Sequence, residues 1–132
     1  MKFGKYSVLV VAVSFGASLL GLPASAHHSY SATYDPERLI TIEGQLVSFT
    51  LRNPHTMVFV LAEDESGATQ RWAVEWGAAT LLRGEGIDGD TLKAGDHIVV
   101  TGLPGRQESA RRMLLRAVER PSDGWSWDGE FD

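Results

Sequence analysis

The sequence predicts an all-β domain, a five-stranded barrel with one short helix that stands behind a cleaved signal peptide. Three observations lead to this prediction. Apolar and polar residues alternate with a period of two through most of residues 39–119. A single stretch, residues 77–83, has helical character, and glycines end it. An apolar segment near the start of the chain is followed by small residues, as in exported proteins.

Residues 1–26 have the parts of a secretory signal peptide. Two lysines precede an apolar run over residues 8–22, which is too short to span a bilayer with margin. Ala24 and Ala26 then form a small-x-small cleavage site. We expect cleavage after Ala26, which makes His27 the first residue and, with 26 residues removed, leaves 106 of the 132. The predicted location is the periplasm, and the mature form has no membrane anchor because no second apolar segment follows.

The mature protein is acidic and has no cysteine. The chain carries 12 Lys and Arg against 17 Asp and Glu, and loss of the two signal-peptide lysines leaves 10 against 17, a net charge of −7. A nucleic-acid partner requires clustered cations, so we expect none. Without cysteine the protein has neither a disulfide nor a thiolate site in an oxidising compartment.

The mature chain begins with an arm over residues 27–38 and continues into strands. Tyr30 and Tyr34 are the groups that we expect to hold this arm on the domain. In the first strand, residues 39–51, the apolar residues change phase beside Gly44, as in a bulged and strongly bent strand. The segment Arg52-Asn53-Pro54 then ends the strand, because proline cannot donate to a ladder.

Four further strands complete the expected barrel over residues 39–120. The second strand is apolar on both faces, which predicts cover on each side. The strands are expected at residues 55–62, 69–76, 98–101 and 112–119, with the helix between the third and fourth. Three strands, a helix and two strands is the order of an OB-like barrel. The core-facing residues are expected to be Phe59, Val74, Val99 and Leu115.

The last segment, residues 121–132, is an acidic tail with aromatic residues. We expect some of its rings to dock on the barrel and the rest of the tail to be mobile. The large apolar residues of this tail are Trp125, Trp127 and Phe131.

Several motifs occur together along the mature chain. They are His27-His28-Ser29, Asn53-Pro54-His55, Trp72-Ala73-Val74-Glu75 and Thr91-Leu92-Lys93-Ala94-Gly95-Asp96. In combination they resemble a family of exported bacterial proteins of unknown function, over nearly all of the mature chain. The resemblance implies an OB-like barrel and a periplasmic location, implies no activity, and points to the histidines at 27, 28 and 55.

An N-terminal histidine is a chelating group. The α-amine and Nδ1 of His27 can close a six-membered chelate, and His28 or His55 can supply further nitrogen, which suits Cu(II). An α-amine has a pKa near ~7.7, so the metal displaces its proton at little cost. Glu75 or Asp35 is a candidate oxygen ligand. The alternative is that the first two histidines are solvated and that the third packs at a strand start.

Three residues of the third strand are further candidates for ligand binding. Glu75 is either a semi-buried carboxylate or, more simply, a solvated charge paired with Arg71 or Arg83. Trp72 and Trp76 either line a groove for a sugar or another flat ligand or, more simply, belong to the core.

These residues predict a binding module and not an enzyme, since no nucleophile–base pair, paired carboxylates or HExxH motif is visible. The ligand is expected to be a divalent metal, copper above others, and no catalytic residue is assigned. Cu(I) held by thioethers has little support, because the mature chain keeps only Met57 and Met113 and both look like core residues. The alternative is a metal-free module that binds an envelope protein or a glycan through the barrel face and the aromatic tail.

Overall fold

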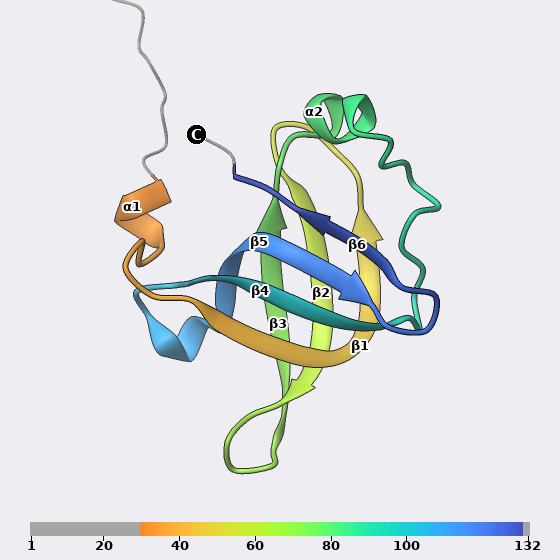
Figure 1. Cartoon of the computed structure of the whole chain (residues 1–132). Helices are drawn as coiled ribbons and strands as arrows, with labels where there is room; N and C mark the ends of the chain where they lie inside the picture. Colours follow the sequence, from red (N-terminus) through yellow and green to blue (C-terminus); the bar gives the residue numbers. More distant parts are fainter. Residues whose placement is uncertain (1–29, 131–132) are drawn as a thin grey trace, which may run out of the picture.

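The computed structural model describes residues 30–130, and its central feature is a closed barrel (Figure 1). The sheet has the order β3-β2-β1-β4-β5-β6, and a further pairing of β3 with β5 closes five strands into the barrel. The elements in chain order are α1 (Tyr30–Thr33), β1 (Ile40–Thr50), β2 (Thr56–Glu63), β3 (Thr69–Trp76), α2 (Ala79–Gly84), β4 (His97–Pro104), η1 (Glu108–Ala110), β5 (Arg112–Arg120) and β6 (Trp125–Asp128). The predicted all-β, OB-like barrel is therefore confirmed.

Two glycines allow the strands to approach closely enough for closure. A Cβ atom on Gly44 in β1 would lie 1.9 Å from the carbonyl oxygen of Leu61 in β2. A Cβ atom on Gly102 in β4 would lie 2.2 Å from the carbonyl oxygen of Leu114 in β5. Both distances are far below van der Waals contact, so any side chain at either position would force these strands apart.

The bend of β1 comes from a bulge, as predicted, but the bulge lies beyond Gly44. The pairing of β1 with β2 shifts register between Leu46 and Ser48. One extra residue in the strand puts both Leu46 and Phe49 on the inner side, where Leu46 is buried and Phe49 packs against the core. The bulge thus accounts for the change of phase in the sequence.

The core is formed by the inward faces of the barrel strands and by residues of α2 and the following loop. Trp72 and Trp76 both belong to it. Its buried members are Ile42, Leu46, Val58, Val60, Ala62, Trp72, Val74, Trp76, Leu82, Ile87, Leu92, Ile98, Val100, Met113, Leu115 and Val118.

Two of the four expected core positions are wrong. Val74 and Leu115 are fully buried, but Phe59 and Val99 are only half-buried. The neighbours of Phe59 along β2 face inward, so alternation turns its ring outward, where the guanidinium of Arg71 lies 4.1 Å from the ring centroid. A strand with two apolar faces does not reveal which face is inside.

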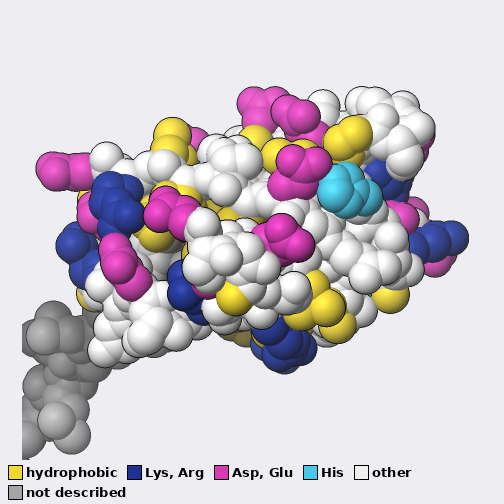
Figure 2. Space-filling model, turned by 90° about the horizontal axis from the view of Figure 1, so that it is seen from below, with side chains coloured by type: hydrophobic (Ala, Val, Ile, Leu, Met, Phe, Trp, Pro, Cys, Tyr) yellow, Lys and Arg dark blue, Asp and Glu magenta, His cyan; other side chains and the backbone are white. Residues whose placement is uncertain are grey.

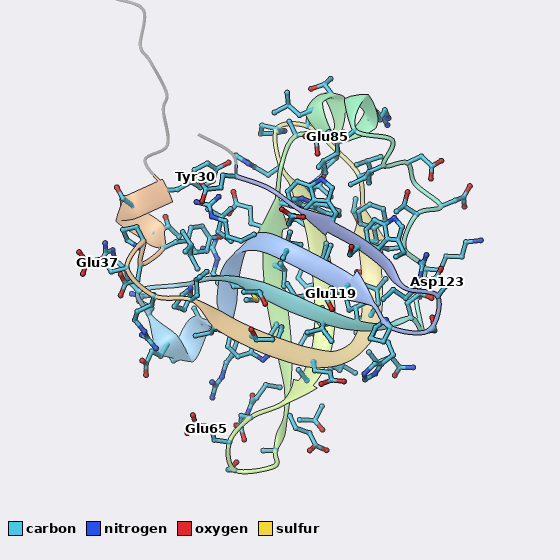
Figure 3. All side chains as sticks on the ribbon, in the orientation of Figure 1. Tyr30, Glu37, Glu65, Glu85, Glu119 and Asp123 are labelled. Atoms are coloured by element: carbon cyan, nitrogen blue, oxygen red, sulfur yellow. The ribbon has the colours of Figure 1, made fainter. Side chains whose placement is uncertain are left out.

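The two ends of the described chain add structure that the sequence does not indicate. The arm contains the short helix α1, and part of the tail forms β6, which pairs with β5. Trp125 and Trp127 pack against the core, so the expected docking of tail rings is confirmed for them, while Phe131 lies outside the described residues. The Trp127 ring lies 5.0 Å from that of Trp76, and its indole N–H donates to Glu85, below α2 (Figure 3).

The surface carries both signs of charge. On the face shown in Figure 2, acidic side chains are spread among apolar ones, and lysines and arginines form separate groups rather than one continuous patch. Between residues 30 and 130, no helix combines the length and apolar character needed to cross a membrane.

Two alanine substitutions test the assignment of faces. Leu115→Ala should cost about 2–5 kcal/mol of unfolding free energy, because it leaves a cavity in the core. Phe59→Ala should cost only about 1–2 kcal/mol, since its ring is half-exposed in the folded state. Urea denaturation of both variants measures the difference. Equal losses would mean that the outward placement of Phe59 is wrong.

Candidate functional site

The candidate site is a cleft on the outside of the barrel, lined by residues of α1 and of the strands β2, β3 and β5. The pairing of β3 with β5 forms the seam at which the barrel closes. The cleft has a volume of about 330 Å³. The cleft is lined by Tyr30, Thr33, Tyr34, Arg52, His55, Met57, Glu75 and Arg112. The cleft therefore combines five kinds of side-chain group: aromatic rings, an imidazole, a thioether, a carboxylate and guanidinium groups.

Strand geometry places Glu75 at the centre of this cleft. Its neighbours in β3, Val74 and Trp76, face the core, so the side chain of Glu75 points out of the barrel. Across the sheet it pairs with Met57 of β2 on one side and with Leu114 of β5 on the other. An outward carboxylate at this position would be solvated if nothing covered the seam.

The N-terminal arm covers the seam. Tyr34 bridges to Gly105 through the backbone, and the N–H of Asp35 donates to the carbonyl of Pro104 over 2.9 Å. The ring of Tyr34 is 1% exposed and forms a second apolar cluster with Leu103 and Leu114. Under this cover, only 9% of the surface of Glu75 remains exposed.

The carboxylate of Glu75 gathers the other polar groups. The Tyr34 hydroxyl donates to its Oε2 over 2.5 Å, and Arg112 Nη2 lies 3.7 Å from the same oxygen. Nδ1 of His55 lies 3.1 Å from Oε1. The Tyr30 hydroxyl, on the side of α1 that faces the barrel in Figure 3, is 3.3 Å from that nitrogen.

The contacts of Nδ1 favour one tautomer of His55. A carboxylate only accepts hydrogen bonds, so the proximity of Glu75 Oε1 favours a proton on Nδ1, with the Tyr30 hydroxyl as a further acceptor beside it. In the neutral ring the lone pair is then on Nε2, which is the nitrogen that can bind a metal. The side chain of His55 is 31% exposed, so it is accessible from the cleft.

The two tyrosines keep their hydroxyl protons. Burial raises the pKa of Tyr34, and its hydrogen bond to Glu75 raises that pKa further. Burial also raises the pKa of Tyr30, with a second contribution from the negative charge of Glu75. Both phenols are therefore protonated near neutral pH.

The structure brings together His55 and Glu75 and separates the other candidates. The simpler expectation for Glu75, a solvated charge paired with Arg71 or Arg83, is wrong, because the arm buries it beside His55 and Tyr34. The sequence does not show that residues 30–34 fold back over the third strand.

The remaining candidates lie elsewhere. The carboxylate of Asp35 accepts the N–H of Glu37 in a turn, and Asp35 does not line the cleft. Trp72 borders a different cavity of about 580 Å³, and Trp76 is fully buried. His97 is exposed and lies 2.7 Å from Glu43.

His27 and His28 lie outside the described residues. Within residues 30–130, no group of three or more His, Asp or Glu side chains is arranged to hold a metal ion. Of these side-chain types, the cleft contains His55 and Glu75.

Sequence reasoning selected two members of the cleft, His55 and Glu75, as site candidates and missed the others. Tyr34 is expected to hold the arm on the domain, but the sequence gives no signal that its hydroxyl and Arg112 meet Glu75. Met57 follows His55 by two residues in the second strand expected from the sequence, residues 55–62, and residues two apart in a strand share a face. The two-residue spacing could have placed Met57 beside His55 in the cleft. The apolar character of Met57 instead led to the expectation that it belongs to the core.

Comparison with known proteins identifies the family and no function. The family of unknown function DUF6152 matches residues 17–114, so the chain belongs to this family, as the resemblance of its motifs indicates. None of the curated proteins matches the sequence. A similar solved structure is that of Rim1, a mitochondrial single-stranded DNA binding protein from S. cerevisiae, with 11% identity and a TM-score of 0.46 over 62% of this chain and 91% of that one. A similarity this low supports no conclusion about the function of this chain.

The hydrogen bond from Tyr34 to Glu75 can be tested by its removal. Tyr34→Phe should cost about 1.5–3 kcal/mol of unfolding free energy, since it deprives a buried carboxylate of its donor. Tyr30→Phe is the matched control and should cost less than about 1 kcal/mol, because its hydroxyl is only part-buried and its contact is longer. Guanidinium denaturation measures both, and a greater loss for Tyr30→Phe would contradict the central role of Glu75.

Proposed function

We propose that this protein is a small exported binding module that holds a divalent metal ion, with Cu(II) the best fit. The metal is bound by the α-amine and imidazole of a processed N-terminal His27, and His28 or His55 supplies further nitrogen. The module acts in the periplasm after removal of residues 1–26. The observation that carries the proposal is the contact between Tyr30 and His55.

That contact supports the proposal because the proposed first residue, His27, precedes Tyr30 by only three residues. The rings of Tyr30 and His55 lie 6.0 Å apart, edge to face, and the Tyr30 hydroxyl is 3.3 Å from Nδ1. One residue spans at most about 3.6 Å, so three residues allow at most about 11 Å between the Cα atoms of His27 and Tyr30. The covalent chain therefore confines the proposed N-terminal chelate to the neighbourhood of this imidazole.

The orientation of His55 supports the same proposal. Metal-binding histidines commonly donate their second ring nitrogen to a carboxylate, which orients the ring and strengthens the ligand. Glu75 places a carboxylate oxygen 3.1 Å from Nδ1, which leaves Nε2 as the nitrogen that the metal would use. The amine and two imidazoles together make an all-nitrogen ligand set, which favours Cu(II) in tetragonal geometry.

Two arginines in the cleft do not oppose the binding of a cation strongly. Arg112 is beside the carboxylate of Glu75, which offsets its charge. Nε of Arg52 donates to the carbonyl of His55, which directs this group toward the backbone. The net charge of −7 predicted for the mature protein attracts cations at longer range.

The alternative is a metal-free module that binds a protein or glycan of the envelope. The aromatic tail is a part of that alternative, and two of its rings, Trp125 and Trp127, already pack against the barrel core. Less aromatic surface is then left for a partner, which favours the metal-binding proposal. Binding of a protein or glycan becomes the better proposal if copper does not bind.

The proposal requires processing at one bond. We expect periplasmic material to begin at His27, because Ala24 and Ala26 stand at the recognition positions of the cleavage site. Intact-mass measurement of purified protein checks this. A start at Ser25 or retention of Met1 would rule out the N-terminal chelate.

Copper titration tests the chelate itself. One alanine added before His27 moves the α-amine away and should weaken Cu(II) binding by about tenfold or more, measured by competition with a chelator of known affinity. His55→Ala should also weaken it, whereas His97→Ala is the control and should leave it unchanged, because His97 lies outside the cleft. Equal affinity of the native and extended proteins would refute the chelate.

A further inference from the structure

We infer that the cleft also holds Cu(I), with the thioether of Met57 as a ligand beside the imidazole of His55. This inference rests on the proposed function and extends it to a second oxidation state of the same metal. It reverses the sequence-based expectation that both methionines of the mature chain are core residues. Met113 is fully buried, but Met57 is half-buried and lines the cleft.

Strand geometry places Met57 next to the groups of the candidate site. Met57 and Glu75 are direct partners in the antiparallel pairing of β2 with β3, where Cβ atoms are typically about 4.5–5.5 Å apart. Oε1 of the same Glu75 lies 3.1 Å from His55 Nδ1. Met57 and His55 therefore flank one carboxylate, and both line the same cleft.

The chemistry of the two side chains suits Cu(I). A thioether is a soft ligand that binds Cu(I) well and carries no charge or proton, and imidazole binds copper in both oxidation states. The chain has no cysteine, so methionine is its only soft sulfur ligand. Among the described residues, Met57 is the one methionine that borders the cleft.

The charges of the residues that line the cleft also favour Cu(I). Arg52 and Arg112 line the cleft together with the single carboxylate of Glu75. The two guanidinium groups outnumber the carboxylate, so a small net repulsion remains for a cation, and it is halved for Cu(I) relative to Cu(II). This difference favours a monovalent ion at Met57.

Substitution of Met57 by leucine separates the thioether from the packing. Met57→Leu keeps the volume and apolar character of the side chain and removes only the sulfur. Met113→Leu is the matched control, because its side chain is buried in the core. Thermal unfolding of both variants establishes that each is folded before metal is added.

The experiment is an anaerobic titration of correctly processed protein with Cu(I) against a Cu(I)-specific chelator, with a parallel Cu(II) titration. Met57→Leu should weaken Cu(I) binding by about tenfold or more and change Cu(II) binding by less than about twofold. Met113→Leu should change neither. X-ray absorption of the Cu(I)-loaded native protein should show copper–sulfur scattering that Met57→Leu abolishes.

The outcomes distinguish this inference from the proposed function. Unchanged Cu(I) affinity in Met57→Leu, or native Cu(I) protein without sulfur scattering, would overturn the role of Met57 and leave the Cu(II) chelate standing. Equal weakening of Cu(I) and Cu(II) would overturn the selectivity for Cu(I). Sulfur-bound Cu(I) without Cu(II) binding would overturn the proposed chelate alone, and binding of neither ion would overturn both.

Discussion

The parallel pairing of β3 with β5 is the constraint on which the rest of the structure depends. It joins residues 73–75 to residues 112–114 and turns an open sheet into a closed barrel. The other strand pairs are antiparallel, and they reach this closure because β1 is bulged and because Gly44 and Gly102 permit backbone contact. With closure, the inward faces form one continuous core that contains two tryptophans.

Closure also creates the candidate site. The seam places the outward-facing Glu75 beside Leu114, and the arm covers both of them through Tyr34. A buried carboxylate requires partners, since an unpaired charge away from water is costly. Tyr34, His55 and Arg112 are these partners, so the need to stabilise one carboxylate determines how the whole cleft is arranged.

The same carboxylate connects the architecture to the proposed chemistry. It lies 3.1 Å from Nδ1 of His55, which leaves Nε2 for a ligand, and it is the cross-strand partner of Met57. An imidazole and a thioether thus line one cleft. The proposed binding of copper in two oxidation states follows from this placement of an imidazole and a thioether.

Local patterns in the sequence determined the number and order of the barrel strands, the bend of the first strand and the break at Asn53-Pro54. They are predictable because alternation, bulges and proline act on neighbouring residues. Only the tertiary structure decided that Phe59 faces outward, that Glu75 is buried and that residues 125–128 form a strand. Each depends on contacts between distant segments, as when Tyr34 covers a carboxylate 41 residues away. No local pattern encodes which distant segment will cover a given face.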